Sequence, residues 1–170
     1  MGNWITNVWD RLFGEQREMK IIIIGLDAAG KTTILKKMRF DEVMQTAPTI
    51  GVNTEDIKVK NVNIKVFDLA GQERMRNVWK YYYTSTDGIV FVVDASNKER
   101  VLEAKDELSK VMSNEEARQI PILVFANKQD LKDSLKGGQV QELLGLEELF
   151  SNKFGGSKES NLKVQECSAL

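Results

Sequence analysis

A run of four consecutive isoleucines that leads directly into a glycine-bounded loop constrains the fold of this chain more than any other feature. Residues 19–24 are apolar except for Lys20 and largely β-branched, which is typical of a buried parallel strand, and the run is too short for a membrane span. The next residues, 25–33, match the pattern G-x-x-x-x-G-K-[ST], and a helical pattern covers residues 32–38. A strand, this loop and a helix in direct succession predict a phosphate-binding loop.

The residue types in this loop suit a polyphosphate. Gly25 and Gly30 let the backbone adopt a positive φ and turn its N–H groups toward an anion, and the dipole of the following helix adds to the attraction. Lys31 can reach the β- and γ-phosphates, and the Thr32 hydroxyl can bind Mg²⁺. The alternative is a glycine-containing turn with a surface lysine. The flanking strand and helix favour a nucleotide-phosphate site.

The composition of the chain limits its size and its chemistry. A length of 170 residues is enough for one core and short for two domains. The 24 Lys and Arg residues nearly cancel the 25 Asp and Glu residues, so there is no electrostatic case for nucleic-acid binding. The single cysteine, Cys167, excludes an internal disulfide and indicates a reducing compartment. Because the chain has no histidine, its chemistry must use carboxylates, amides, hydroxyls, lysine and a metal ion.

Two segments after the phosphate loop carry side chains that could act on a γ-phosphate. A proline and a glycine mark residues 46–51 as a loop, where the Thr49 hydroxyl could complete a Mg²⁺ shell, although most loop threonines have no such role. Residues 52–59 and 62–67 predict an antiparallel hairpin.

The second strand of this hairpin leads into Asp68, at the edge where open α/β sheets bind ligands. Asp68 can hold a water of Mg²⁺, the Gly71 N–H can meet a γ-phosphate, and Gln72 can orient an attacking water.

Further elements follow from the apolar pattern of the rest of the chain. We expect strands at residues 88–94, 121–126 and 162–167, and helices at 98–112, 137–144 and 146–150. In the first of these helices the residues expected to point inward are Val101, Leu102, Leu108 and Val111. Residues 74–83 carry more aromatic rings than core packing explains, which predicts an exposed partner surface. These rings are Trp79, Tyr81, Tyr82 and Tyr83.

The strand at residues 121–126 delivers the sequence Asn-Lys-Gln-Asp at positions 127–130. Guanine presents two adjacent donors, N1–H and N2–H₂, and the Asp130 carboxylate can accept both, whereas adenine would leave the carboxylate poorly paired. Asn127 can tie neighbouring loops together, and the stem of Lys128 can lie across the base. A backbone N–H within residues 168–170 could meet the guanine O6.

The N-terminus predicts attachment to a membrane. Residues 1–6 match M-G-x-x-x-[ST], so Gly2 would accept myristate once Met1 is removed. Apolar residues between positions 4 and 13 lie on one face of a helix, and a single myristoyl chain needs such a second signal. The alternative is an ordinary helix packed permanently on the core. We therefore divide the chain into a membrane-addressed segment, residues 1–17, and a GTP-binding domain, residues 18–170.

At this point the motifs resemble a known family. Residues 25–32, 48–49, 68–72, 127–130 and 167–169 occur in the order and spacing of the Ras-like small GTPases. Residues 25–33, 48–51 and 126–131, together with the N-terminal glycine and amphipathic helix, are similar to the ADP-ribosylation factor (Arf/Arl) branch. The resemblance covers essentially the whole chain.

The resemblance implies a three-layer α/β fold: a mostly parallel six-stranded sheet with helices on both faces, preceded by the N-terminal amphipathic helix. The family's C-terminal helix is expected to be missing, as in a truncated chain. The resemblance also implies a GDP/GTP cycle with Mg²⁺, in which Gln72 and Lys31 are catalytic and Thr32, Thr49 and Asp68 (through water) serve the metal. The nucleotide-binding residues it implies are Asp27, Ala28, Ala29, Gly30, Lys31, Thr32, Thr33, Thr49, Gly71, Asn127, Lys128, Asp130, Ser168 and Ala169.

The same resemblance implies partners and a location. The partners are an exchange factor, a GTPase-activating protein that supplies an arginine, effectors that bind residues 46–52 and 68–83, and a membrane surface, with no nucleic acid. The location is cytoplasmic and reversibly membrane-associated, with the Golgi and vesicle-mediated transport as the family's usual setting. Val52 and Phe67 replace the family's usual Phe and Trp, and Ala70 its usual glycine, so effector identity stays open.

No arginine lies just before Thr49, which predicts slow intrinsic hydrolysis of GTP.

Two other functions remain open at this stage. A GTP-binding scaffold that hydrolyses little or not at all is the closer alternative. A metabolic phosphotransferase would use the same loop but needs a second-substrate site, for which the sequence offers no candidate.

Overall fold

The structure, a computed structural model, describes residues 17–40, 49, 51–59, 62–149 and 162–169. In chain order its elements are β1 (Arg17–Ile24), α2 (Lys31–Phe40), β2 (Val52–Val59), β3 (Val62–Leu69), α3 (Glu73–Arg76), η1 (Trp79–Tyr82), β4 (Gly88–Asp94), α4 (Lys98–Ser113), α5 (Glu115–Gln119), β5 (Ile122–Asn127), α6 (Gly137–Leu144) and β6 (Leu162–Glu166).

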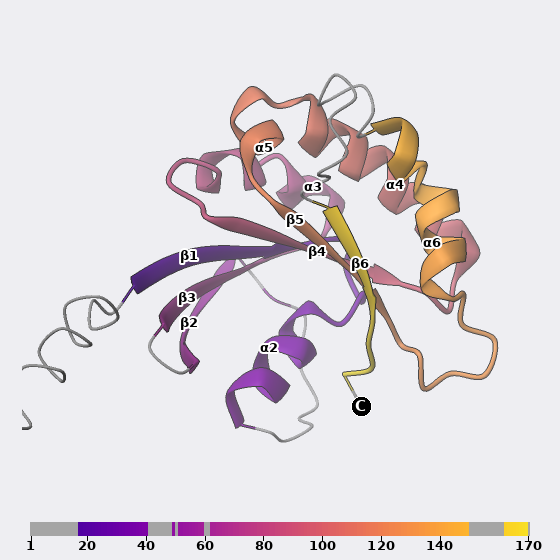
Figure 1. Cartoon of the computed structure of the whole chain (residues 1–170), viewed down its shortest axis with the longest axis horizontal. Coiled ribbons are helices and arrows are strands. Elements are labelled where there is room, and N and C mark those ends of the chain that lie inside the picture. Colours follow the sequence, from indigo (N-terminus) through magenta and orange to yellow (C-terminus); the bar gives the residue numbers. More distant parts are fainter. Residues whose placement is uncertain (1–16, 41–48, 50, 60–61, 150–161, 170) are drawn as a thin grey trace, which may run out of the picture.

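The six strands form one sheet in the order β2-β3-β1-β4-β5-β6. Only β2 and β3 are antiparallel, and every other neighbouring pair is parallel. Helix α2 covers one face of the sheet, while α4, α5 and α6 cover the other (Figure 1). This arrangement confirms the predicted three-layer α/β fold with a mostly parallel six-stranded sheet.

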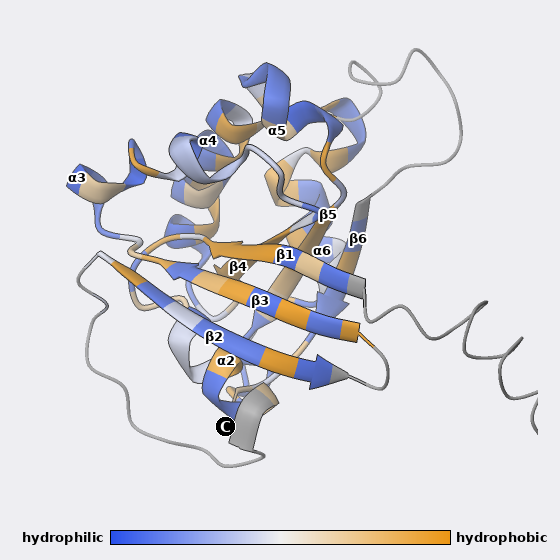
Figure 2. Ribbon diagram, turned by 90° about the vertical axis from the view of Figure 1, so that its left-hand side faces the viewer, coloured by the Kyte–Doolittle hydropathy of each residue, from blue (hydrophilic) through white to orange (hydrophobic). Residues whose placement is uncertain are grey.

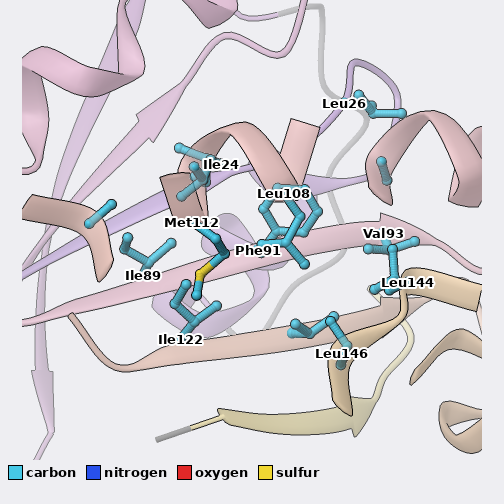
Figure 3. Packing of buried hydrophobic residues seen from close by; sticks show 14 of the residues in the cluster. Ile24, Leu26, Ile89, Phe91, Val93, Leu108, Met112, Ile122, Leu144 and Leu146 are labelled. Atoms are coloured by element: carbon cyan, nitrogen blue, oxygen red, sulfur yellow. The ribbon is translucent and has the colours of Figure 1, made fainter. Parts of the chain in front are cut away.

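The central strand β1 contributes to two cores. Ile22 is fully buried on the face covered by α4, where Phe91 of β4 and Leu108 of α4 also pack (Figure 3). Ile23 points to the opposite face and packs in a cluster that includes Leu35 of α2. Successive side chains of a strand alternate between faces, so a strand covered on both sides needs a continuous apolar run. The run of isoleucines at the start of the chain meets that requirement.

The apolar character of the sheet falls off toward its edge. Figure 2 shows apolar β1 and β4 in orange and the edge strand β2 mostly in blue. In β2, Ile57 is buried while Val52 is exposed, which fits an edge strand covered on one face only.

The expected inward face of α4 is wrong at one position. Val101, Leu108 and Val111 are buried, but the side chain of Leu102 is 46% exposed. One residue turns an α-helix by about 100°, so the residue that follows an inward-facing Val101 is directed sideways and out.

The prediction of an exposed aromatic surface is also wrong. Trp79 and Tyr83 are buried, and Tyr82 packs half-buried with its ring centroid 6.0 Å from that of Phe67. Trp79 Nε1 donates a 3.0 Å hydrogen bond to the carbonyl of a buried alanine in the preceding loop. Of the four rings, only Tyr81 is exposed, at 72%. Most of this cluster therefore completes the core.

Several predictions fall outside the described residues. The N-terminal amphipathic helix and Gly2 lie there, as do residues 46–48 and the predicted loop at 151–161. Within the described ranges, every helix is too short or too polar to cross a membrane.

Candidate functional site

A cleft of about 560 Å³ opens where the loops after β1, β3 and β5 meet. Ligands of open α/β sheets bind beyond the carboxyl ends of the strands, and this cleft lies there. Ala29, Asp68 and Ser168 do not line the cleft but bond to residues that do. The lining residues are Asp27, Ala28, Gly30, Lys31, Thr32, Thr33, Thr49, Gly71, Gln72, Asn127, Lys128, Asp130, Leu131 and Ala169.

The two glycines of the phosphate loop are required by its geometry. Gly25 has φ +139°, and a Cβ there would lie 2.3 Å from the backbone oxygen of Val92. Gly30 has φ +94°, and a Cβ there would lie 2.3 Å from Nδ2 of Asn127. Both positions combine a positive φ with a close neighbour, so a side chain at either one would strain the loop.

Lys31 lies at the floor of the cleft with 6% of its surface exposed. Its Nζ donates hydrogen bonds to the carbonyls of Gly25 (3.0 Å) and Leu26 (2.8 Å). Burial lowers the pKa of Lys31 to about 8, although the nearby charge of Asp68 acts to raise it. The loop therefore holds an amine whose charged form an anion would stabilise.

An oxygen-rich cluster lies at the start of α2. The Thr32 hydroxyl donates to Asp68 Oδ2 at 2.5 Å, and the Thr49 hydroxyl lies 2.8 Å from that of Thr32 and 3.3 Å from the same carboxylate oxygen. Asp68 is fully buried, its Oδ1 has no hydrogen-bond partner among the described residues, and burial raises its pKa. Hydroxyl and carboxylate oxygens are the donors that a small hard cation such as Mg²⁺ prefers, so the cluster fits that ion.

The segment after β3 is packed tightly on the phosphate loop. The Gly71 carbonyl accepts hydrogen bonds from the Asp27 N–H (3.2 Å) and from Arg76 Nε (2.9 Å). A Cβ at position 71 would lie 2.4 Å from the Gly25 carbonyl oxygen. Gln72 follows in an extended conformation and lines the cleft. This packing brings Gly71 and Gln72 to the same cleft as the phosphate loop, and their contacts with a γ-phosphate and an attacking water stay predictions.

Asn127 joins the two ends of the cleft. It is 1% exposed, its Nδ2 donates to the Ala29 carbonyl at 2.8 Å, and its Oδ1 lies 3.6 Å from Cys167 Sγ, the donor of that contact. Burial raises the pKa of Cys167 to about 11, so this thiol stays neutral at ordinary pH. The predicted role of Asn127 in tying neighbouring loops together is confirmed.

The remaining residues of the Asn-Lys-Gln-Asp segment have fixed partners. Lys128 has φ +67°, and its Nζ lies 2.6 Å from Asp94 Oδ2. Burial acts to raise the pKa of Asp94, but hydrogen bonds from Lys128 and Ser96 outweigh it and hold that pKa below its usual value. Asp130 is exposed at the cleft and accepts a 2.5 Å hydrogen bond from Ser168 Oγ. Ser168, in the loop after β6, therefore orients the Asp130 carboxylate.

Sequence reasoning missed three residues at this site. Leu131 lines the cleft beside Asp130 with 47% of its surface exposed. Arg76 and Arg100 both lie within ion-pair distance of Asp27. The arginines come from α3 and α4, far from the phosphate loop in sequence, and no spacing rule connects them to it.

One end of this cleft is lined by a loop suited to polyphosphates, and the other end carries a carboxylate suited to the paired donors of guanine. Together with the six-stranded fold, this arrangement defines the class of P-loop small GTPases.

The comparisons with known proteins place the chain within that class. Residues 5–170 match the model of the ADP-ribosylation factor (Arf) family, and the chain belongs to this family. Its structure is similar to that of the Arl6 (BBS3) small GTPase from Trypanosoma brucei with the bound nucleotide analogue GppNp. The TM-score is 0.79 at 28% sequence identity, over 90% of this chain and 88% of that chain.

Proposed function

We propose that this protein is a GTP-binding molecular switch that hydrolyses GTP slowly and associates with membranes according to its bound nucleotide. One observation carries the proposal: a single cleft is lined by Lys31 and Thr32 at one end and by Asp130 at the other. Membership of the Arf family supports the general class of GTP-binding switch.

Asp130 would select guanine. Its carboxylate can accept from both N1–H and N2–H₂ of the base, and adenine lacks these donors. The side chain of Lys128, held by Asp94, would lie along the base, and the backbone around Ala169 would face the guanine O6.

The other end of the cleft would hold the phosphates and Mg²⁺. Thr32 and Thr49 would bind the ion directly and Asp68 through water, since their oxygens already converge. The ion, when bound, supplies positive charge to the phosphate oxygens. Lys31 would neutralise the β- and γ-phosphates, and Gln72, which lines the cleft, would orient the attacking water.

Intrinsic hydrolysis would be slow because no arginine lies just before Thr49 to act in cis. A GTPase-activating protein would supply that arginine, with a rate gain of about a thousandfold or more. An exchange factor would load GTP, and effectors would bind residues 46–52 and 68–83 in the GTP state. The family in general implies these kinds of partner.

The N-terminal segment would read out the nucleotide state at a membrane. Myristate on Gly2 and the amphipathic helix would act as two signals, because neither alone holds a protein firmly. We place the protein in the cytoplasm with reversible attachment to membranes, the Golgi among them, in vesicle-mediated transport. Flotation of the myristoylated protein with liposomes should require a GTP analogue and should fail for Gly2→Ala.

Competition binding tests the core of the proposal. GTP and GDP should displace a labelled guanine nucleotide from the protein, and ATP in large excess should not. Displacement by ATP as readily as by GTP would contradict the proposal and favour a phosphotransferase. If Gln72→Leu has no effect on the turnover measured in the presence of an activating protein, that result supports the alternative of a GTP-binding scaffold that hydrolyses little or not at all.

A further inference from the structure

Asp27 is an acidic side chain in a loop otherwise suited to anions. It lines the cleft with its side chain 50% exposed, and its charge acts on Lys31. A carboxylate beside a phosphate site repels the ligand, and the low dielectric of a cleft strengthens the repulsion. A phosphate site that contains Asp27 therefore needs compensating positive charge.

Arg100, in the first turns of α4, supplies part of that charge. One guanidinium nitrogen, Nη2, donates to Asp27 Oδ1 at 2.9 Å and to the Asp27 backbone carbonyl at 2.8 Å. In a trans peptide the next N–H is antiparallel to that carbonyl, so the N–H of Ala28 is directed away from Arg100. The other nitrogen, Nη1, donates to Glu103 at 2.6 Å, which holds the guanidinium in place. Arg100 thus fixes both the side chain and the backbone of Asp27.

Arg76, on α3, approaches the same carboxylate from the segment after Gly71. It is 8% exposed, and its Nη2 lies 3.5 Å from Asp27 Oδ1 and 2.8 Å from Glu103 Oε1. Its Nη1 donates to Glu107 at 3.2 Å. Arg76 and Arg100 therefore share Asp27 on one side and Glu103 on the other. Burial acts to raise the pKa of Asp27, but the hydrogen bond and charge of Arg100, with the charge of Arg76, keep that pKa below its usual value.

We propose that Arg76 and Arg100 are positioning residues that clamp Asp27, so that its negative charge is neutralised and held in place when the neighbouring cleft binds nucleotide phosphates. This inference rests on the proposed function, because it assumes that the cleft binds a nucleotide. In this inference both arginines allow the phosphate loop to contain an acidic residue, and neither arginine contacts the phosphates.

The charge balance of the cluster indicates that both arginines are needed to neutralise its carboxylates. Six groups linked by ion pairs carry no net charge in total: Asp27, Glu103 and Glu107 against Arg76, Arg100 and Lys110. Loss of one arginine leaves a net negative charge next to the cleft. Replacement of Asp27 by a neutral residue removes the cause of the repulsion, so the two changes should compensate each other.

Arg100 is the better position for a test, because its side chain is 30% exposed whereas that of Arg76 is 7% exposed. We would measure the affinity of a fluorescent, non-hydrolysable GTP analogue with Mg²⁺ for the wild type, Arg100→Ala, Asp27→Asn and the double variant. Arg100→Ala should weaken binding about fivefold, and Asp27→Asn should strengthen it about twofold. The double variant should return to within about twofold of the wild type.

Arg118→Ala is the matched control. It removes one exposed arginine from α5, the helix that precedes β5 and so lies at the amino end of the parallel strands, and it should leave the affinity unchanged. A double variant as weak as Arg100→Ala would overturn the inference, because Arg100 would then act on the phosphates or on folding. Equal affinities of wild type and Arg100→Ala would also overturn it while leaving the proposed function intact. A wild type that binds no guanine nucleotide would refute both.

Discussion

The side-chain amide of Asn127 donates a 2.8 Å hydrogen bond to the backbone carbonyl of Ala29, across 98 residues of sequence. The bond is buried, and it joins the phosphate loop to the loop that would select the base. Gly30 lies directly beneath it, since a Cβ at that position would lie 2.3 Å from the same amide nitrogen. The two ends of the candidate site are therefore held at a fixed separation by one side chain.

Asn127→Ala should destabilise the nucleotide-free protein by about 1–3 kcal/mol, because the buried carbonyl of Ala29 loses its partner. It should also weaken nucleotide binding, since the phosphate loop and the base loop lose their tie. Urea unfolding and nucleotide titration measure the two effects. Asn114→Ala, which removes the cap of α5, should cost about 1 kcal/mol of stability and leave nucleotide affinity unchanged. Equal losses of affinity in both variants would mean that the bond has no specific role.

Gly30→Ala tests the same contact from the other side. The methyl group would collide with Asn127 Nδ2, and the backbone would have to keep φ at +94°. We expect a loss of stability of about 1–3 kcal/mol, with reduced nucleotide affinity. Gly138→Ala, in α6, has no atom within 4 Å of the new Cβ and should be neutral or slightly stabilising. Thermal unfolding of the two variants compares them directly, and similar melting temperatures would contradict the prediction.

Much of the fold follows from local pattern. Ile22, Ile23 and Ile24 of the isoleucine run are buried, on alternating faces of the sheet, and residues 88–94 and 137–144 form the predicted strand and helix with the predicted ends. The hairpin formed by β2 and β3 pairs as expected. These elements are specified by the period of their apolar residues and by motifs whose residues are close in sequence.

What the sequence could not predict depends on contacts between distant elements. The clamp of Arg76 and Arg100 on Asp27 joins α3, α4 and the phosphate loop, and isolated arginines carry no such information. Trp79 and Tyr83 are a second case. They are buried in the core, and no local sequence pattern predicts where the sheet lies relative to them. Tertiary packing decides these cases, not the composition of the segment.

The buried amine of Lys31 predicts a pH dependence of stability. Because burial lowers the pKa of Lys31 to about 8 in the folded protein, the unfolded chain binds more protons between that pH and about 10.5. The contribution of Lys31 to the free energy of unfolding should therefore rise with pH across this window, by about 3 kcal/mol in total. Below pH 8 both states carry the charge, and the contribution should be constant.

Lys31→Met isolates this contribution. Burial raises the pKa of Tyr83 to about 12 and that of Cys167 to about 11, so these two groups lower the stability as the pH rises. Both remain in the variant, and their effect cancels in the difference between wild type and Lys31→Met. Urea unfolding of protein stripped of nucleotide, at pH 7 and pH 10, gives this difference. A difference that stays the same at both pH values would show that Lys31 is not buried as the structure has it.

Asp130→Asn should exchange guanine for xanthine as the preferred base. The carboxylate accepts from two guanine donors, whereas an amide offers one acceptor and one donor, and xanthine carries a carbonyl where guanine carries its amino group. We expect GDP binding to weaken by at least about tenfold and xanthosine diphosphate to bind more tightly than GDP. Asp133 is an exposed aspartate of the same loop that does not line the cleft, so Asp133→Asn should leave both affinities unchanged.

Titration of the two nucleotides against both variants distinguishes base selection from a general loss of charge, because only base selection reverses the order of affinities. An unchanged preference for GDP in Asp130→Asn would place base recognition elsewhere in the cleft.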